Sequence, residues 1–256
     1  MGKGIINMKI ALCLSGQPRG IPYACQQLTD NIINVNDTMD IFLHAWFDPK
    51  DVGNPYGSAQ PHQDNHVGYV KENTDRILLD AFKPKKYIIE PQRDFPFTSN
   101  FKSSPTARQD VMASIFYTMY KSNELKKEYE VENNFKYDCV IRTRYDLYYN
   151  APIVINNYIN ILKKKIVVAD SFQRDQDALE WRSLKPMVDI FAFSSSENMD
   201  IFCSVFPNME ELNKVIDPPF GEVYLGYHTR VLNNIKLHRA PFDFEILHRV
   251  LNVNDL

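Results

Sequence analysis

The sequence predicts an α/β fold in which a mainly parallel sheet is flanked by helices. Short apolar runs of strand length alternate with segments of helical periodicity through the first 150 residues. Turns rich in Gly, Pro and Asn separate these segments. Such alternation is typical of parallel strands that are joined by crossover helices. Because no flexible linker or internal repeat interrupts the pattern, residues 1–256 are predicted to form one domain.

The first half of the chain supplies four predicted strands and three predicted helices. The first strand is apolar at nearly every position, which indicates burial on both faces. In the first helix Ala24, Leu28 and Ile32 recur on one face, and in the third helix Met112 and Phe116 do the same. The predicted strands are residues 8–15, 39–46, 85–91 and 137–144, and the predicted helices are residues 22–34, 70–82 and 106–130.

The second half of the chain is predicted to be less regular. Ser196 suits the N-cap of a helix because apolar residues follow it at helical spacing. Residues 237–250 fit no single pattern, so they are left unassigned. The predicted strands of this half are residues 164–170 and 188–195, and the predicted helices are residues 196–206 and 221–233.

Composition narrows the class of protein. The net charge is −3, which does not indicate a nucleic-acid partner. The four cysteines form no CxxC pair, so we expect reduced thiols in a cytoplasmic protein rather than a structural zinc site. No apolar run approaches the roughly 20 residues that a membrane helix needs, so no membrane span is expected. A polar loop over residues 48–68 is long enough to predict a working role.

Polar and charged residues follow three of the predicted strands. Parallel sheets bind ligands at the carboxyl ends of their strands, and all three clusters fall at such ends. Their common location strengthens the prediction that each belongs to a site. The clusters are Ser15 to Arg19 after the first strand, His44, Trp46 and Asp48 after the second, and Arg142, Arg144 and Asp146 after the fourth.

Arg142, Arg144 and Asp146 occupy alternate positions, so on a strand all three would face the same way. Two guanidinium groups suit phosphate oxygens through charge-assisted hydrogen bonds. A carboxylate beside them suits a divalent cation that bridges to the same phosphates. The alternative is that Asp146 only neutralises Arg144 at a solvated strand end. Together with the turn after the first strand, the triplet favours a site for a diphosphate and a metal.

Two motifs carry a resemblance to a known family. SGQPRG closes the first predicted strand, and YDCVIRTRYDL lies in the middle of the chain. Over about residues 8–235 the sequence resembles a group of glycosyltransferases with a GT-A-like fold. This group occurs in large DNA viruses, algal viruses among them, and in bacterial surface-polysaccharide loci. A strand that begins at Asp189 and a helix that begins at Glu222 also match the group.

The resemblance implies a nucleotide-sugar donor, a UDP-sugar with UDP-xylose as one candidate, and a glycan or glycoprotein acceptor. Residues 8–150 would form the nucleotide-sugar-binding half, and residues 151–256 the acceptor-binding half. Arg144 stands where other GT-A enzymes have the first Asp of an Asp-x-Asp metal motif. Asp146 is therefore the carboxylate implied to hold Mn²⁺ or Mg²⁺, with His228 as a further candidate ligand. The residues implied to bind the nucleotide sugar are Ser15, Gly16, Arg19, Arg142 and Arg144.

An inverting transfer, which is the expectation here, needs a general base to take the proton from the acceptor hydroxyl. Asp189 is the first candidate, and Glu222 is the second. Asp175 and Asp177 are further candidates in a polar segment. Each has a structural alternative: a carboxylate such as Glu222 is favoured in the first turn of a helix by the helix dipole.

Two other functions stay open. A nucleotidyl- or phosphotransferase would use the same arginine–metal site, although the sequence has no GxxxxGK[ST] loop of the common ATPases. A non-catalytic module would keep a pocket for a sugar nucleotide without turnover. An Asp146→Asn variant separates these functions, because loss of turnover is expected where a metal held by Asp146 assists the reaction.

Overall fold

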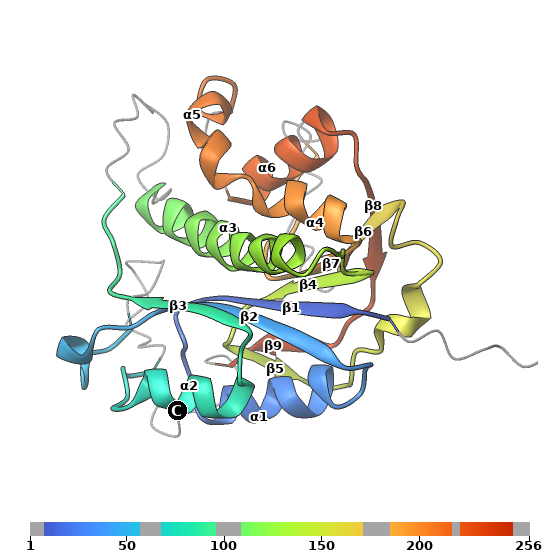
Figure 1. The fold of residues 1–256 in the computed structure, drawn as a ribbon. Coiled ribbons are helices and arrows are strands. Elements are labelled where there is room, and N and C mark those ends of the chain that lie inside the picture. The colour runs from blue at the N-terminus through green and yellow to red at the C-terminus, as the bar shows by residue number, and fades with distance from the viewer. Residues whose placement is uncertain (1–7, 57–67, 96–108, 171–184, 217–220, 248–256) are drawn as a thin grey trace, which may run out of the picture.

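The computed structural model describes residues 8–56, 68–95, 109–170, 185–216 and 221–247. A seven-stranded sheet lies at its centre, in the order β3-β2-β1-β4-β7-β6-β8 (Figure 1). Its strands are β1 (Ile10–Gly16), β2 (Met39–Trp46), β3 (Lys86–Glu90), β4 (Cys139–Thr143), β6 (Lys165–Ala169), β7 (Phe191–Ser194) and β8 (Lys236–Ala240).

The sheet is mostly parallel. β1 pairs in parallel with β2 and with β4. The pairs β2–β3 and β6–β8 are also parallel. Among the described strands of this sheet, β7 is the one that runs antiparallel to its neighbours, β4 and β6. The carboxyl ends of β1 to β4 therefore lie at one edge of the sheet, and β7 begins at that same edge, where Phe191 pairs with Thr143.

Helices cover both faces of the sheet (Figure 1). One face carries α3 (Gln109–Glu132) and α4 (Ser196–Cys203), with α5 (Met209–Leu212) and α6 (Gly221–Gly226) above them. The other face carries α1 (Tyr23–Leu28), α2 (Thr74–Phe82) and a ribbon of β5 (Leu147–Tyr149) and β9 (Phe244–Ile246). The remaining helical segments are the π-helical turns Thr29–Ile33 and Tyr227–Leu232 and the 3-10 turns Pro49–Asp51, Ile155–Tyr158 and Phe206–Asn208.

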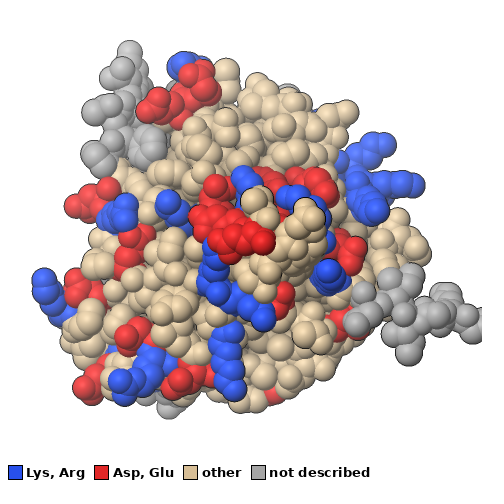
Figure 2. Space-filling model, in the orientation of Figure 1, with Lys and Arg blue, Asp and Glu red and all other residues tan. Residues whose placement is uncertain are grey.

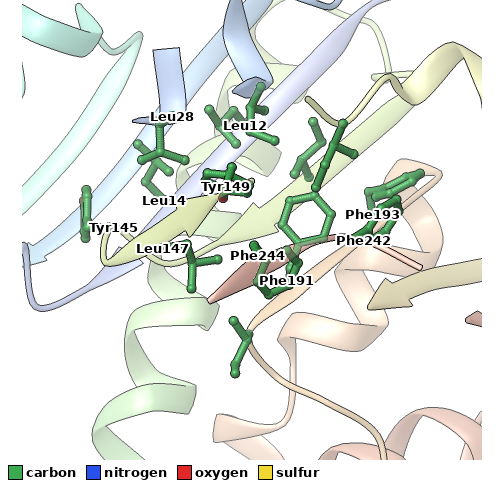
Figure 3. Packing of buried hydrophobic residues seen from close by; sticks show 14 of the residues in the cluster. Leu12, Leu14, Leu28, Tyr145, Leu147, Tyr149, Phe191, Phe193, Phe242 and Phe244 are labelled. Atoms are coloured by element: carbon green, nitrogen blue, oxygen red, sulfur yellow. The ribbon is translucent and has the colours of Figure 1, made fainter. Parts of the chain in front are cut away.

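Alternate side chains of the central strands enter two hydrophobic clusters, one on each face of the sheet. In β1, Leu12 and Leu14 enter the cluster beneath α1, whereas Ala11 and Cys13 enter the cluster beneath α3. This alternation follows from the two-residue period of a strand, and it explains why β1 is apolar throughout. Figure 3 shows the first cluster, in which the labelled members are Leu12, Leu14, Leu28, Tyr145, Leu147, Tyr149, Phe191, Phe193, Phe242 and Phe244.

A buried ion network joins α3 to α4. The Lys126 ammonium donates to the carboxylates of Glu130 (3.1 Å) and Asp200 (2.7 Å). The Ser196 hydroxyl accepts from Lys126 (2.6 Å) and donates to Glu130 (2.6 Å). Glu130 also accepts from the backbone N–H of Tyr137 at 2.9 Å. Buried charges are tolerated when they are paired and hydrogen-bonded in this way, so the network fixes the two helices against each other.

The predicted α/β class with a mainly parallel sheet is confirmed. The strand predicted over residues 137–144 is shorter than expected, because β4 ends at Thr143 and the chain bends before β5. The expectation that Arg142, Arg144 and Asp146 share one strand face is therefore wrong. Arg142 is the one member of this triplet that lies on β4, and the other two lie in the bend.

The second half of the chain is more regular than the sequence indicates. β6, β7 and β8 extend the same sheet as β1 to β4, so residues 8–150 and 151–256 both contribute strands to it. Residues 237–250, which fit no single pattern, include most of β8 and all of β9. The helix predicted over residues 196–206 ends at Cys203. Within the described ranges, no helix is both long enough and apolar enough to cross a membrane.

Candidate functional site

The turn after β1 brings Arg19 to the carboxyl edge of the sheet. Gly16 has a φ of +117°, a conformation that residues with a side chain rarely adopt. The glycine therefore allows the chain to leave the strand at this point. The Gln17 side-chain oxygen then accepts a hydrogen bond from Arg19 Nε at 3.0 Å. With its guanidinium oriented in this way, Arg19 donates through Nη1 to Asp146 Oδ2 at 3.4 Å.

Arg144 and Asp146 form a two-pronged ion pair in the bend between β4 and β5. Arg144 Nε donates to Asp146 Oδ1 and Arg144 Nη2 donates to Asp146 Oδ2, both at 2.7 Å. The Asp146 side chain is 3% exposed, whereas those of Arg144 and Arg19 are 24% and 15% exposed. The two guanidinium groups carry more N–H donors than one carboxylate can accept. Asp146 is thus the buried centre of the cluster, and the arginines form its accessible rim.

Arg142 is buried on β4, and two of its side-chain nitrogens lack a hydrogen-bond partner within the described part of the chain. Its relative exposure is 1%, and neither Nε nor Nη1 has a partner among the described residues. Burial lowers the pKa of Arg142 to about 10, and the nearby charge of Asp189 acts in the opposite direction. The guanidinium therefore remains charged at neutral pH. Buried charges that lack hydrogen bonds are costly, and this one lies at the carboxyl edge of the sheet, where parallel sheets commonly bind ligands.

Burial and the Asp146 charge also set the pKa values of the other two arginines. For Arg19, the pKa is lowered, chiefly by burial and also by the charge of Arg144, although the Asp146 carboxylate acts to raise it. For Arg144, burial also acts to lower the pKa, but the contacts with Asp146 outweigh it and the pKa is raised. Asp146 therefore stabilises the charged form of both arginines.

The two candidate bases lie in segments that contact each other. The backbone N–H of Met187 donates to the carbonyl of Glu222 at 2.9 Å, so the first turn of α6 lies beside the segment that leads into β7. Asp189 is half-buried, and its charge acts on Arg142 and Arg144. The Glu222 residue is exposed. Asp189 is therefore the candidate base that the structure brings into electrostatic range of the arginines.

A cavity of about 280 Å³ opens at the carboxyl ends of β1, β2 and β3. Gln17 lines it and also binds Arg19, so the cavity and the arginine cluster share a wall. Trp46 and Asp48 contribute from the end of β2. The Tyr56 hydroxyl, on another wall, donates to the Pro18 carbonyl at 3.4 Å. Further lining residues are Asp51, Asn54 and Gln92.

The loop over residues 48–68, which the sequence predicts to have a working role, forms part of this cavity through residues 48–56. Sequence reasoning missed Tyr56 and Gln92, because neither belongs to a motif. The length of the loop was the available signal for Tyr56. Residues 57–67 of the loop lie outside the described residues, as do Asp175 and Asp177.

Ser15 and His228 have different surroundings. The Ser15 hydroxyl is buried near the end of β1 and has no partner among the described residues. His228 Nε2 lies 3.0 Å from the Ser204 hydroxyl and 3.1 Å from the Ile201 carbonyl. Burial lowers the pKa of His228. The described hydrogen bonds of its ring are therefore to the end of α4, and none of them joins it to Asp146.

His44 belongs to a packed polar cluster between β2, β3 and α3. His44 Nε2 lies 3.0 Å from Glu90 Oε1, which also accepts from the Tyr117 hydroxyl at 3.0 Å. Arg93 pairs with the other oxygen of Glu90. Burial lowers the pKa of His44 to about 4, so its ring is neutral at pH 7. The Trp46 ring contacts the His44 ring edge to face. His44 is therefore accounted for as a structural residue by this packing and by its bond to Glu90.

Asp146 does not fit the role of a metal ligand in this arrangement. Each of its oxygens accepts from a guanidinium group, so a cation would have to displace those donors and face their positive charge. Within the described ranges, no group of three or more His, Cys, Asp or Glu residues is arranged to hold a metal ion. The surroundings of Asp146 therefore do not fit a divalent metal ion.

Comparison with known protein families identifies one model that covers more than half of the chain. The model, described as a domain of unknown function and designated DUF7796, matches residues 5–177. The matched residues include the turn after β1, the residues that line the cavity, and Arg19, Arg142 and Arg144. No curated protein matches the sequence. The chain belongs to the DUF7796 family.

Proposed function

We propose that this protein is a glycosyltransferase that moves a sugar from a nucleoside-diphosphate sugar to a glycan acceptor. The observation that carries this proposal is Arg142 at the carboxyl edge of the sheet, a buried guanidinium with two nitrogens that lack a hydrogen-bond partner among the described residues. Arg144 and Arg19 lie at the same edge. An anionic ligand would compensate the excess positive charge, and a diphosphate suits guanidinium donors.

The cavity supports a nucleoside at the same edge. Its volume of about 280 Å³ is close to the lower end of the range for small-molecule sites. The Asp48 carboxylate and the Gln17 amide are suited to ribose hydroxyls, and Trp46 and Tyr56 provide aromatic surfaces. Because Gln17 also contacts Arg19, a ligand in the cavity would extend its diphosphate toward the arginines. UDP is the proposed nucleotide, in line with the sequence resemblance.

The chemistry of glycosyl transfer fits these groups. As the glycosidic bond breaks, negative charge develops on the departing nucleoside diphosphate, and guanidinium groups aimed there stabilise the transition state. Asp189 is the proposed general base for the acceptor hydroxyl, because it lies in electrostatic range of Arg142 and Arg144. Ser15 and Gly16 would lie against the nucleotide at the end of β1. The GT-A type of fold and the inverting outcome are part of this proposal.

The proposal is tested by incubating the full chain with a panel of UDP-sugars, UDP-xylose included, and glycan acceptors while UDP release is measured. We expect acceptor-dependent release of UDP. Asp189→Asn should lower turnover by about 10²–10⁴-fold with little change in UDP affinity, as for the loss of a general base. Glu222→Gln is the matched variant, and a larger loss in it would move the base to Glu222.

Two results would replace this proposal with the alternatives. Release of pyrophosphate from nucleoside triphosphates would favour a nucleotidyltransferase. Binding of UDP without consumption of any nucleotide sugar would favour a non-catalytic module.

A further inference from the structure

We propose that the donor diphosphate is held by guanidinium groups without a divalent metal, and that Asp146 is a positioning residue that fixes Arg19 and Arg144. The inference rests on the proposed function for the identity of the ligand. It departs from the metal site that the sequence predicts at Asp146. Its basis is the set of partners that Asp146 already has.

Asp146 contacts both accessible arginines at once. Arg144 occupies both carboxylate oxygens at 2.7 Å, and Arg19 shares Oδ2 at 3.4 Å. Two long side chains with like charge would repel each other and lose rotamer freedom if they had to meet at one ligand. A buried carboxylate between them removes most of that cost before the ligand arrives. This is the arrangement expected for a preorganised anion site.

The accessible and buried arginines have different roles. Arg144 and Arg19 are partly exposed, and Arg144 has N–H groups beyond the two that donate to Asp146, so Arg144 is assigned as the direct donor to phosphate oxygens. Arg142 is shielded from solvent, so its charge acts at short range with little screening. Arg142 is therefore assigned to raise the positive potential at the edge. On the face shown in Figure 2, Lys and Arg side chains lie among Asp and Glu side chains.

Binding of UDP and of inorganic pyrophosphate to the full chain tests this inference directly. Isothermal titration is carried out in EDTA and again in Mn²⁺. We expect the Kd for UDP in EDTA to lie within about threefold of the Kd in Mn²⁺. This change is smaller than the roughly tenfold change that the loss of one strong contact would cause. A loss of binding in EDTA of about 100-fold or more would overturn the inference. Stoichiometric Mn²⁺ bound without nucleotide, seen by electron paramagnetic resonance, would also overturn it.

Variants separate a positioning carboxylate from a metal ligand. Asp146→Asn should weaken UDP binding by about tenfold in EDTA and in Mn²⁺ alike, because the arginines are no longer fixed. Equal affinity of Asp146→Asn and the natural protein in EDTA, with a difference appearing only in Mn²⁺, would identify a metal ligand instead. Asp138→Asn is the matched control, since Asp138 is exposed next to the start of β4, at the opposite edge of the sheet. It removes the same charge and should leave both affinities unchanged.

The two proposals fail in different ways. UDP that binds equally well in EDTA while no UDP-sugar is consumed would remove the proposed function and leave the metal-free anion site standing. If sugar transfer and UDP binding are both lost in EDTA, the proposed function stands and the inference fails.

Discussion

Lys126 and Arg142 are both buried cations, and their surroundings are opposite. Lys126 donates to Glu130, Ser196 and Asp200, so its positive charge is fully compensated within the fold. Arg142 has two nitrogens without a partner among the described residues. The comparison teaches that burial alone does not assign a charged residue to structure. Hydrogen bonds within the fold account for the burial of Lys126, whereas the proposed anionic ligand would account for the burial of Arg142.

The largest expected effect is at the paired cation. Lys126→Met should lower the free energy of unfolding by about 3 kcal/mol, because it removes the buried cation shared by Glu130 and Asp200 and leaves Lys136 as the remaining cation beside Glu130. Urea denaturation of the purified variant measures the change. Adding Glu130→Gln should recover part of the loss, since the buried negative charge is then also removed. Additive losses in the double variant would show that the two side chains are not coupled.

His44 lies between the two cases, because one ring nitrogen is bonded to Glu90 and Nδ1 has no partner among the described residues. Its folded-state pKa of about 4 lies below the ordinary value of 6.5, so the unfolded state binds the proton more readily. The stabilisation from the neutral ring is complete above pH 6.5 and is lost as the pH falls toward 4. We expect the free energy of unfolding to fall by up to about 3 kcal/mol over this window.

Urea denaturation at a series of pH values measures this loss. Glu90 acts in the same direction, because its folded-state pKa is also lowered: burial opposes this shift, but the hydrogen bonds from His44, Arg93 and Tyr117 outweigh it. His44→Gln should flatten the profile between pH 6.5 and 4. A profile as steep in His44→Gln as in the natural protein would assign the acid sensitivity to other groups.

Two buried serines, Ser196 and Ser15, differ in their hydrogen bonding in the same way, and the expected effects on stability are smaller. Ser196 bonds both Lys126 and Glu130, so Ser196→Ala should lower the free energy of unfolding by about 2 kcal/mol, as for hydrogen bonds to charged groups. The Ser15 hydroxyl has no partner among the residues that the structure describes, so Ser15→Ala should change the free energy of unfolding by less than about 0.5 kcal/mol. Thermal and urea unfolding of the two variants provide the measurement. A loss of stability in Ser15→Ala equal to that in Ser196→Ala would contradict this difference between the two serines.

Much of the fold could be predicted because local pattern reports burial directly. The strand over residues 39–46 is found with the predicted bounds, and β1 and β3 differ by one or two residues at their ends. The failures arise where tertiary structure overrides alternation. β4 stops at Thr143, where the chain bends into β5, and nothing in the alternation of Arg142 and Arg144 signals that bend.

The candidate site could be predicted in its location more than in its contacts. The rule that ligands bind at strand carboxyl ends placed Arg19, Arg144 and Asp146 together, and the structure brings them into contact. Sequence could not show that the Asp146 oxygens are already occupied by arginines. It also could not show which cation is paired, because Lys126 and Glu130 meet Ser196 through tertiary packing.

The most direct test of the unpaired charge at Arg142 is to measure stability and UDP affinity together in Arg142→Met. Removal of a buried charge with incomplete hydrogen bonding should leave the free energy of unfolding unchanged or raise it by up to about 4 kcal/mol, while UDP affinity falls by at least about tenfold. Arg142→Lys, which keeps the charge, should retain more of that affinity. A variant Arg142→Met that unfolds more easily by several kcal/mol and still binds UDP as tightly as the natural protein would contradict the account.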